Sequence, residues 1–322
     1  MANNELKQKI AEQTAGKKIA LIGSSGNVGH KGLALLIESG KAASITAFDK
    51  KIPRIQNLPE QVKVLSDESG DITNSDAVYN AVAGNDTVVC AVGVPRVTPK
   101  GEKPLTPYDI EENGMKNIVQ AALKTGVKHI IYISVLAVRL GDKLPPFHHG
   151  AVAKYRAEQA LIKSGISYTI LRPTGYFQDY REMFQYAISA KYDVVDKGTT
   201  LAQPIDEQNI AEMVIASIGN EQARNKIIAA GGSEIFDRIE LAKVFSKIIK
   251  KEITPISLTP EEYKKTYFNS DLMLFRAVTD SVLSKTEMET LKGVYPYLKL
   301  TRLEDYLNNP DDPVLKEYFQ KK

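Results

Sequence analysis

Three glycines at three-residue spacing follow a short, mostly apolar run near the start of the chain. Gly23, Gly26 and Gly29 lie between the run 18–22 and a helix-like pattern. In such a loop the first glycine permits a tight turn, the second lets a phosphate approach the backbone, and the third lets the helix pack closely. Because the helix start also offers unpaired N–H groups, we predict a pyrophosphate-binding loop. Its residues are Gly23, Ser24, Ser25, Gly26, Asn27, Val28 and Gly29.

The second apolar run, Ser44–Phe48, ends in an acid and a base side by side. Asp49 is placed to accept hydrogen bonds from the adenosine ribose of NAD. Lys50, Lys51 and Arg54 would instead attract the 2′-phosphate of NADP. The cations outnumber the acid, and a salt bridge to Lys50 would turn Asp49 aside. We therefore favour NADP slightly, and NAD remains nearly as well suited.

Composition limits the classes of partner. The chain has 322 residues, enough for one large domain or two moderate ones, and a net charge of +3 spread along its length. This balance favours neither nucleic acid nor an anionic membrane. The polar start, 1–17, lacks the apolar core of a signal peptide, and no later segment approaches a membrane span, so we expect a cytoplasmic protein. Cys90, in an apolar run, is expected to be a small buried hydrophobe.

Strand-like runs alternate with helix-like runs, which predicts a doubly wound parallel sheet of the Rossmann type, an α/β fold. The expected strands are Lys18–Ile22, Ser44–Phe48, Val62–Leu65, Thr87–Val92, His129–Ser134, Ser167–Leu171 and Lys226–Ala229. The expected helices include Ser75–Ala83, Tyr108–Lys124, Val152–Lys163 and Asp237–Lys250. The proline-rich segment Pro95–Pro107 is expected to be a mobile loop over the site.

Aromatic residues follow the sixth expected strand, at the carboxyl edge of the sheet where α/β folds hold their ligands. We predict that Tyr176, Phe177 and Tyr180 line a substrate pocket. The expected organisation is an N-terminal helix at 1–16, a dinucleotide-binding domain at 17–175, a substrate-pocket segment at 176–204, a return to the sheet at 205–235 and a smaller helical C-terminal cap at 236–322.

A family resemblance covers residues 17 to about 250. Its motifs are Gly23-Ser-Ser-Gly26-Asn-Val-Gly29, Gly70-Asp71-Ile72, Asp86-Thr-Val-Val-Cys-Ala-Val-Gly93, Asn113-Gly-Met-Lys-Asn117, Tyr132-Ile-Ser134 and Leu171-Arg-Pro173. Together they resemble the atypical short-chain dehydrogenase/reductase superfamily, in its NmrA-like NAD(P)-binding branch. Three further motifs are similar to proteins of the divinyl chlorophyllide reductase type: Arg172-Pro-Thr-Gly-Tyr-Phe177, Pro204-Ile-Asp-Glu-Gln-Asn-Ile-Ala211 and Ala230-Gly-Gly232.

The resemblance implies a set of cofactor contacts. Lys154 corresponds to the family lysine that binds the hydroxyls of the nicotinamide ribose, and Asn113 is expected near the centre of the sheet. Asp71 and Ile72 are expected along the adenine. The other cofactor-site residues implied are Ala91, Val92, Gly93, Ser134 and Pro173.

Two catalytic residues of the superfamily are missing here. Gly150 stands four residues before the lysine, where the family has its tyrosine, and Leu136 stands where a serine is expected. His148 and His149, on the loop entering the lysine helix, are the best-placed proton donors. Other donors remain open, namely Tyr155, Tyr176 and the lysine alone, as does a protein without turnover. A metal at the two histidines is not expected, because neighbouring histidines diverge and no further ligand lies at the right spacing.

Two functions fit these residues. The first is an NAD(P)H-dependent oxidoreductase that transfers hydride to a small apolar carbonyl or unsaturated substrate. The second is a non-catalytic NAD(P)-sensing regulator whose C-terminal helices bind a partner protein. Lys154 and the aromatic segment favour the enzyme, whereas the missing tyrosine and serine favour the regulator. A homo-oligomer is compatible with either function.

Overall fold

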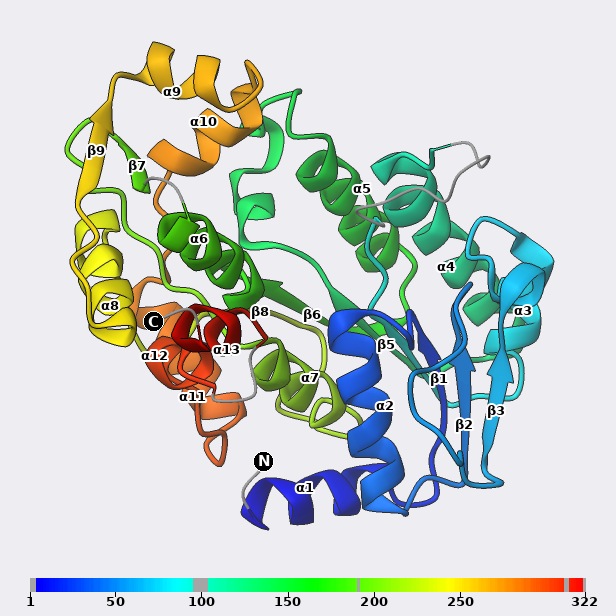
Figure 1. Cartoon of the computed structure of the whole chain (residues 1–322). Helices are drawn as coiled ribbons and strands as arrows, with labels where there is room; N and C mark the ends of the chain where they lie inside the picture. Colours follow the sequence, from blue (N-terminus) through cyan, green and yellow to red (C-terminus); the bar gives the residue numbers. More distant parts are fainter. Residues whose placement is uncertain (1–3, 95–103, 190–191, 310–312, 321–322) are drawn as a thin grey trace. The chain divides into compact units, whose positions relative to one another are not determined.

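The computed structural model describes residues 4–94, 104–189, 192–309 and 313–320 (Figure 1). Most of the expected loop Pro95–Pro107 lies outside these described residues. The chain divides into two units. The first comprises Met1–Arg172, Gln208–Ala229 and Glu289–Lys299, and the second comprises Pro173–Glu207, Ala230–Met288 and Leu300–Lys322. The segment 236–322, expected as one cap, is therefore shared between the two units.

The first unit is built on a seven-stranded sheet. Its seven strands differ in burial: those that begin at Lys18, Ser44, Thr87 and His129 are buried along most of their length, as continuous apolar runs predict, whereas the strand that begins at Val62 is not. They are β1 (Lys18–Ile22), β2 (Ser44–Phe48), β3 (Val62–Leu65), β4 (Thr87–Cys90), β5 (His129–Ile133), β6 (Ser167–Pro173) and β8 (Lys226–Ala230). The order across the sheet is β3-β2-β1-β4-β5-β6-β8. Each neighbouring pair of strands from β3 to β6 in this order is parallel.

Helices cover both faces of this sheet. Figure 1 shows α2 and α7 on the near face and α3, α4 and α5 on the other. This arrangement confirms the predicted doubly wound α/β fold. The helices of the first unit are α1 (Asn4–Thr14), α2 (Asn27–Ser39), α3 (Ser75–Val82), α4 (Gly114–Thr125), α5 (His149–Lys163) and α7 (Glu207–Ile215), with the short helices η1 (Asp67–Gly70), η2 (Tyr108–Asn113) and η3 (Leu136–Lys143). Helix α11 (Lys285–Val294) spans the boundary between the units.

The chain changes direction across the sheet between β1 and β4. From β1 it passes outward to β2 and β3, whereas β4, β5 and β6 follow on the opposite side. In doubly wound folds the loops at such a switch point diverge and leave a crevice at the carboxyl ends of the strands. The glycine loop follows β1, so the fold places it at this crevice.

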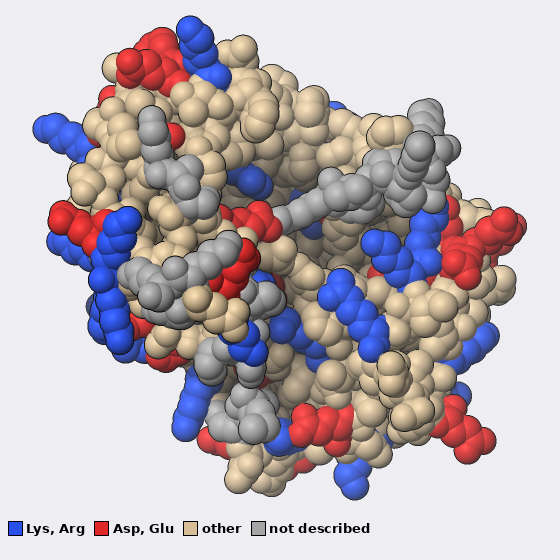
Figure 2. All heavy atoms as spheres, viewed as in Figure 1, with Lys and Arg blue, Asp and Glu red and all other residues tan. Residues whose placement is uncertain are grey.

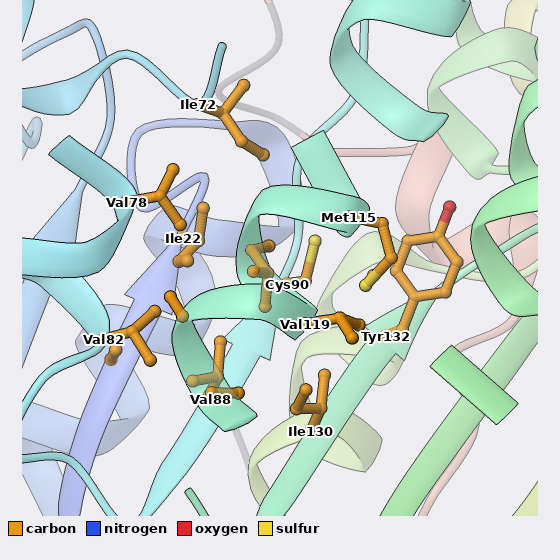
Figure 3. Packing of buried hydrophobic residues seen from close by; sticks show 14 of the residues in the cluster. Ile22, Ile72, Val78, Val82, Val88, Cys90, Met115, Val119, Ile130 and Tyr132 are labelled. Carbon is orange, nitrogen blue, oxygen red and sulfur yellow. The ribbon is translucent and has the colours of Figure 1, made fainter. Parts of the chain in front are cut away.

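A hydrophobic cluster between the sheet and α3 and α4 fixes the carboxyl ends of β4 and β5. Cys90 is 1% exposed in this cluster, and burial raises the pKa of its thiol to about 12, which confirms its role as a buried hydrophobe. Figure 3 shows Met115 beside the ring of Tyr132, whose hydroxyl points away from the labelled apolar side chains. The aromatic ring of Tyr132 is therefore part of the core, whereas its hydroxyl points out of the hydrophobic cluster.

The second unit contains a separate core and a two-stranded sheet. Strands β7 (Tyr192–Val195) and β9 (Pro255–Leu258) pair in parallel, although neither was predicted from the sequence. Phe177 and Tyr180, expected in a substrate pocket, lie in the hydrophobic cluster of this unit. Its helices are α6 (Phe177–Ser189), α8 (Arg238–Ile249), α9 (Pro260–Thr266), α10 (Asp271–Val278), α12 (Leu303–Leu307) and α13 (Pro313–Gln320).

Several predicted boundaries need correction. The helix expected over Tyr108–Lys124 is divided, because its first six residues form the π-helix η2 and α4 follows. The expected strand Thr87–Val92 ends at Cys90, where Ala91 and Val92 begin the loop beside the glycines. Helix α5 begins at His149 rather than Val152.

Candidate functional site

The three glycines of the loop have three different structural roles. Gly23 has a φ of +89°, and a Cβ there would lie 2.7 Å from the carbonyl carbon of Ala91. A Cβ on Gly29 would lie 1.9 Å from the carbonyl oxygen of Gly23. By contrast, a Cβ on Gly26 would approach no described atom closer than 3.4 Å. The outer glycines are therefore required by the fold, whereas a Cβ on the middle one would make ordinary van der Waals contacts.

The start of α2 behind this loop is the predicted phosphate site. Gly26 is the N-cap of α2 and has no side chain, so no N-cap side chain accepts hydrogen bonds from the first N–H groups of the helix. A helix that starts without a side-chain cap presents its first N–H groups to a ligand. A Cβ on Gly93, after β4, would likewise meet no described atom within 4 Å. The loop therefore has the backbone geometry that a dinucleotide pyrophosphate requires.

Asp49 is turned toward the loop by backbone hydrogen bonds. Its Oδ2 accepts the N–H of Ser25 at 3.0 Å and its Oδ1 accepts the N–H of Lys51 at 3.1 Å. The expectation that Lys50 would pair with Asp49 is wrong, because Lys50 Nζ lies 2.9 Å from Asp71 Oδ2. Burial disfavours the charge on Asp71, but hydrogen bonds from Lys50 and Thr73 outweigh this effect and lower the pKa of Asp71.

Asn113, expected near the centre of the sheet, is exposed, and its role at the cofactor site stays a prediction. The amide four residues later makes the inward contact, because Asn117 Nδ2 donates to the carbonyl oxygen of Ile72 at 3.0 Å. Ile72 itself is 6% exposed and packs in the core of the first unit. A Cβ on Gly114 would collide with the Ile72 side chain, so this glycine permits the close packing.

A charged cluster lies at the carboxyl end of β5, and we call Glu111, Tyr132 and Lys154 the lysine cluster. Lys154 Nζ lies 2.8 Å from Glu111 Oε2 and 3.0 Å from the carbonyl oxygen of Ile133. The hydroxyl of Tyr132 donates to the same Glu111 oxygen at 3.0 Å. Glu111 is 3% exposed and comes from η2, so the three side chains belong to three separate elements.

The sequence pattern did not single out Glu111 or Tyr132 as site residues, but a signal for Glu111 exists. Glu111 is spaced like the buried residues Met115, Ile118 and Ala122 along one helix face. A carboxylate on an apolar stripe needs a buried partner, because an isolated buried charge is strongly disfavoured. Lys154 supplies that partner.

The protonation of Tyr132 follows from its surroundings. Burial and the negative charge of Glu111 raise the pKa of Tyr132 well above its usual value. The phenol therefore keeps its proton and acts as a hydrogen-bond donor to the carboxylate. Lys154 Nζ also lies 5.2 Å from the centre of the Tyr132 ring, within the range of a cation–π contact.

The histidines predicted as proton donors have other contacts in this structure. Nδ1 of His148 accepts the N–H of Ala151 at 3.3 Å, so His148 caps helix α5. Nδ1 of His149 lies 3.1 Å from the hydroxyl of Tyr108. Ser134 is 3% exposed, and its Oγ has no hydrogen-bond partner among the described residues. Ser134 directly follows Ile133, whose carbonyl oxygen accepts a hydrogen bond from Lys154.

The residues predicted to contact substrate belong to the second unit, as does Pro173. Phe177 is 1% exposed and its ring packs edge-on against Tyr306 at 5.2 Å. The guanidinium of Arg238 lies 6.0 Å from the ring centre of Tyr180. These contacts give Phe177 and Tyr180 a packing role, and their contact with substrate stays a prediction.

Within the described residues, no group of three or more histidines, cysteines and acids is arranged to hold a metal ion. No helix in the described part of the chain is long and apolar enough to span a membrane.

Comparison with known proteins is consistent with this geometry. The chain is similar to N-acetyl-alpha-D-glucosaminyl-diphospho-ditrans,octacis-undecaprenol 4-epimerase of Escherichia coli O157:H7, with 29% identity over 245 residues, 69% of this chain and 67% of that protein. The predicted similarity to divinyl chlorophyllide reductase is confirmed by the Arabidopsis thaliana divinyl chlorophyllide a 8-vinyl-reductase, 24% identical over 251 residues, 73% of this chain and 58% of that protein.

Among solved structures, the NADPH-dependent quinone oxidoreductase of Escherichia coli, complexed with NADPH, shares the fold. Its TM-score is 0.72 at 20% identity, and the match covers 90% of this chain and 98% of that one. Residues 23–221, more than half of the chain, match the family model described as NAD(P)H-binding. The chain therefore belongs to the NAD(P)H-binding family, in agreement with its glycine loop.

Proposed function

We propose that the protein is an NADPH-dependent reductase that acts on a small apolar carbonyl or unsaturated compound in the cytoplasm. The observation that carries this proposal is the placement of Lys154. Strands β1, β4 and β5 are parallel neighbours, so the glycine loop after β1 and the lysine cluster after β5 lie at one edge of the sheet. A dinucleotide held by its pyrophosphate at the loop extends along this edge.

Two parts of the chain hold the cofactor in this proposal. The N–H groups at the start of α2 bind the pyrophosphate, and Lys154 donates to the hydroxyls of the nicotinamide ribose. The nicotinamide supplies the hydride when it is bound. Ser134 Oγ is buried and has no hydrogen-bond partner among the described residues. His148, His149 and Tyr176 remain candidates for the proton that the reduced substrate needs.

The preference for NADPH rests on the tip of β2. Both carboxylate oxygens of Asp49 accept backbone N–H groups, so they have fewer free lone pairs for a ribose hydroxyl. Lys50, Lys51 and Arg54 are exposed beside it. Exposed cations attract a 2′-phosphate, which favours NADPH over NADH.

The experiment is an NADPH oxidation assay with a panel that contains a quinone, an α,β-unsaturated ketone and an aldehyde. We expect turnover of at least one compound, with NADPH preferred over NADH. Lys154→Met should lower kcat/KM by about tenfold or more, as loss of a charged hydrogen bond predicts. Lys163→Met, an exposed lysine on the same helix, is the matched control and should retain wild-type activity. Equal losses in both variants would contradict the proposal.

A second candidate function, binding of a partner protein, is favoured by one surface of the second unit. A groove of about 620 Å³ lies beside α8, and its lining includes Lys243, Lys250 and Lys251, together with Glu252 and with Lys247, which pairs with Glu304. Figure 2 shows basic side chains over α8 on the left of the view. Such a groove suits an acidic segment of a partner.

A pull-down with the wild-type chain and a Lys243→Glu/Lys251→Glu variant tests this second function. Loss of a specific, salt-sensitive partner in the variant would support it. Identical recovery with both chains would exclude the groove as the binding surface.

A further inference from the structure

Two adjacent glutamates of η2 have different partners. Glu111 is 3% exposed and contacts Tyr132 and Lys154. The side chain of Glu112 is 14% exposed and accepts hydrogen bonds from two surface cations, Lys116 and Arg156. Because η2 is a π-helix, its wider turn departs from regular helical spacing, as is common near functional sites. The two carboxylates therefore form a natural pair for comparison.

The contacts of Lys154 leave part of its ammonium group available. An ammonium carries three N–H donors, and the described contacts use two of them, one for Glu111 and one for the carbonyl oxygen of Ile133. The Lys154 side chain is 17% exposed. The two buried acceptors fix the position of Nζ and leave one donor for a ligand.

The charge of Lys154 is balanced by Glu111 rather than by another acid. Tyr132 is protonated, as argued above, and the raised pKa of Cys90 keeps that thiol neutral. Glu158, which also influences Tyr132, is held by two hydrogen bonds from Arg172. Within the described residues, Glu111 is the acid in direct contact with the Lys154 ammonium.

We propose that Glu111 is a positioning residue that orients Lys154 and supplies the counter-charge for its ammonium, so that one N–H remains fixed for the ribose of the cofactor. The inference rests on the proposed function in one respect, the identity of the Lys154 ligand. Tyr132 in turn fixes Glu111 by donating to the same oxygen.

The test is a calorimetric titration with NADPH from about pH 6.5 to about pH 9.5, the range in which a destabilised amine loses its proton. Glu111→Gln should bind NADPH about tenfold more weakly at neutral pH, and its affinity should fall further as the pH rises. The wild type should show a smaller fall over the same range. Glu112→Gln, the matched control, should follow the wild type at every pH.

A double variant separates positioning from structure. Arginine stays protonated over this range, so Glu111→Gln/Lys154→Arg should lose the extra alkaline fall of Glu111→Gln. If Glu111→Gln is folded and its pH profile superimposes on that of the wild type, Glu111 does not support Lys154. If Glu111→Gln does not fold, Glu111→Asp serves instead, and wild-type NADPH affinity in that variant would overturn the proposal. Failure of the wild type itself to bind any dinucleotide would count against the proposed function.

Discussion

The glycine loop and the lysine cluster lie at the same edge of one sheet, but they are built in different ways. The loop is made of backbone from one continuous segment, 23–29, and its shape depends on missing Cβ atoms. The lysine cluster is made of side chains from η2, β5 and α5, brought together by the fold. A backbone site is therefore encoded locally, whereas a side-chain site depends on tertiary packing.

The largest expected effect comes from Gly29→Ala, which tests whether the loop depends on backbone contact. The new Cβ would lie 1.9 Å from the carbonyl oxygen of Gly23, and backbone cannot move aside as a flexible side chain can. We expect a loss of at least about 3 kcal/mol in the free energy of unfolding, measured by urea denaturation. A variant as stable as the wild type would show that the backbone of the loop can move to accommodate the new methyl group.

Lys154→Ala makes the corresponding change in the lysine cluster. It leaves the carboxylate of Glu111 buried with only the Tyr132 hydroxyl as a described partner. We expect about 3 kcal/mol of destabilisation, because an unpaired buried charge is costly, and NADPH binding weakened about tenfold. In a Glu111→Gln background the same substitution should destabilise much less. Additive effects in urea denaturation would mean that the two residues do not interact.

Gly26→Ala distinguishes binding from stability within the loop. The structure has room for this Cβ, since the nearest described atom is 3.4 Å away. We expect unfolding free energy within about 0.5 kcal/mol of the wild type, but NADPH affinity lower by about tenfold or more, because the methyl group occupies space meant for phosphate. Retained affinity would place the pyrophosphate elsewhere.

Asp49→Ala should have the smallest effect. Its carboxylate accepts the backbone N–H groups of Ser25 and Lys51 and so stabilises the loop. Its loss should lower the affinities for NADPH and NADH by a similar factor of about threefold to tenfold. Parallel calorimetric titrations with both dinucleotides check this. A selective gain for NADPH would show that Asp49 contacts the ribose instead.

The contrast between a locally encoded site and one assembled by tertiary packing explains which features the sequence predicted. The bounds of β1, β2 and β3 match the predicted ranges, because short runs rich in apolar residues mark the strands of a parallel sheet. The glycine spacing was likewise visible in one segment. Strands β7 and β9 were missed, and they pair with each other across a long stretch of chain rather than with the predicted sheet.

The lysine cluster shows why the remaining site could not be predicted. Lys154 was identified by resemblance, but its partner lies 43 residues away in the sequence. The π-helix that carries Glu111 was predicted as regular helix, since hydrophobic periodicity does not reveal an added residue in one turn.

The most direct test of the account is a calorimetric titration of the wild-type chain with NADPH and NADH, alongside Gly26→Ala. We predict saturable binding of both dinucleotides, tighter for NADPH, and loss of most of the affinity in the folded variant. Absence of binding to the wild type, or equal binding to both chains, would contradict the assignment of the glycine loop as the cofactor site.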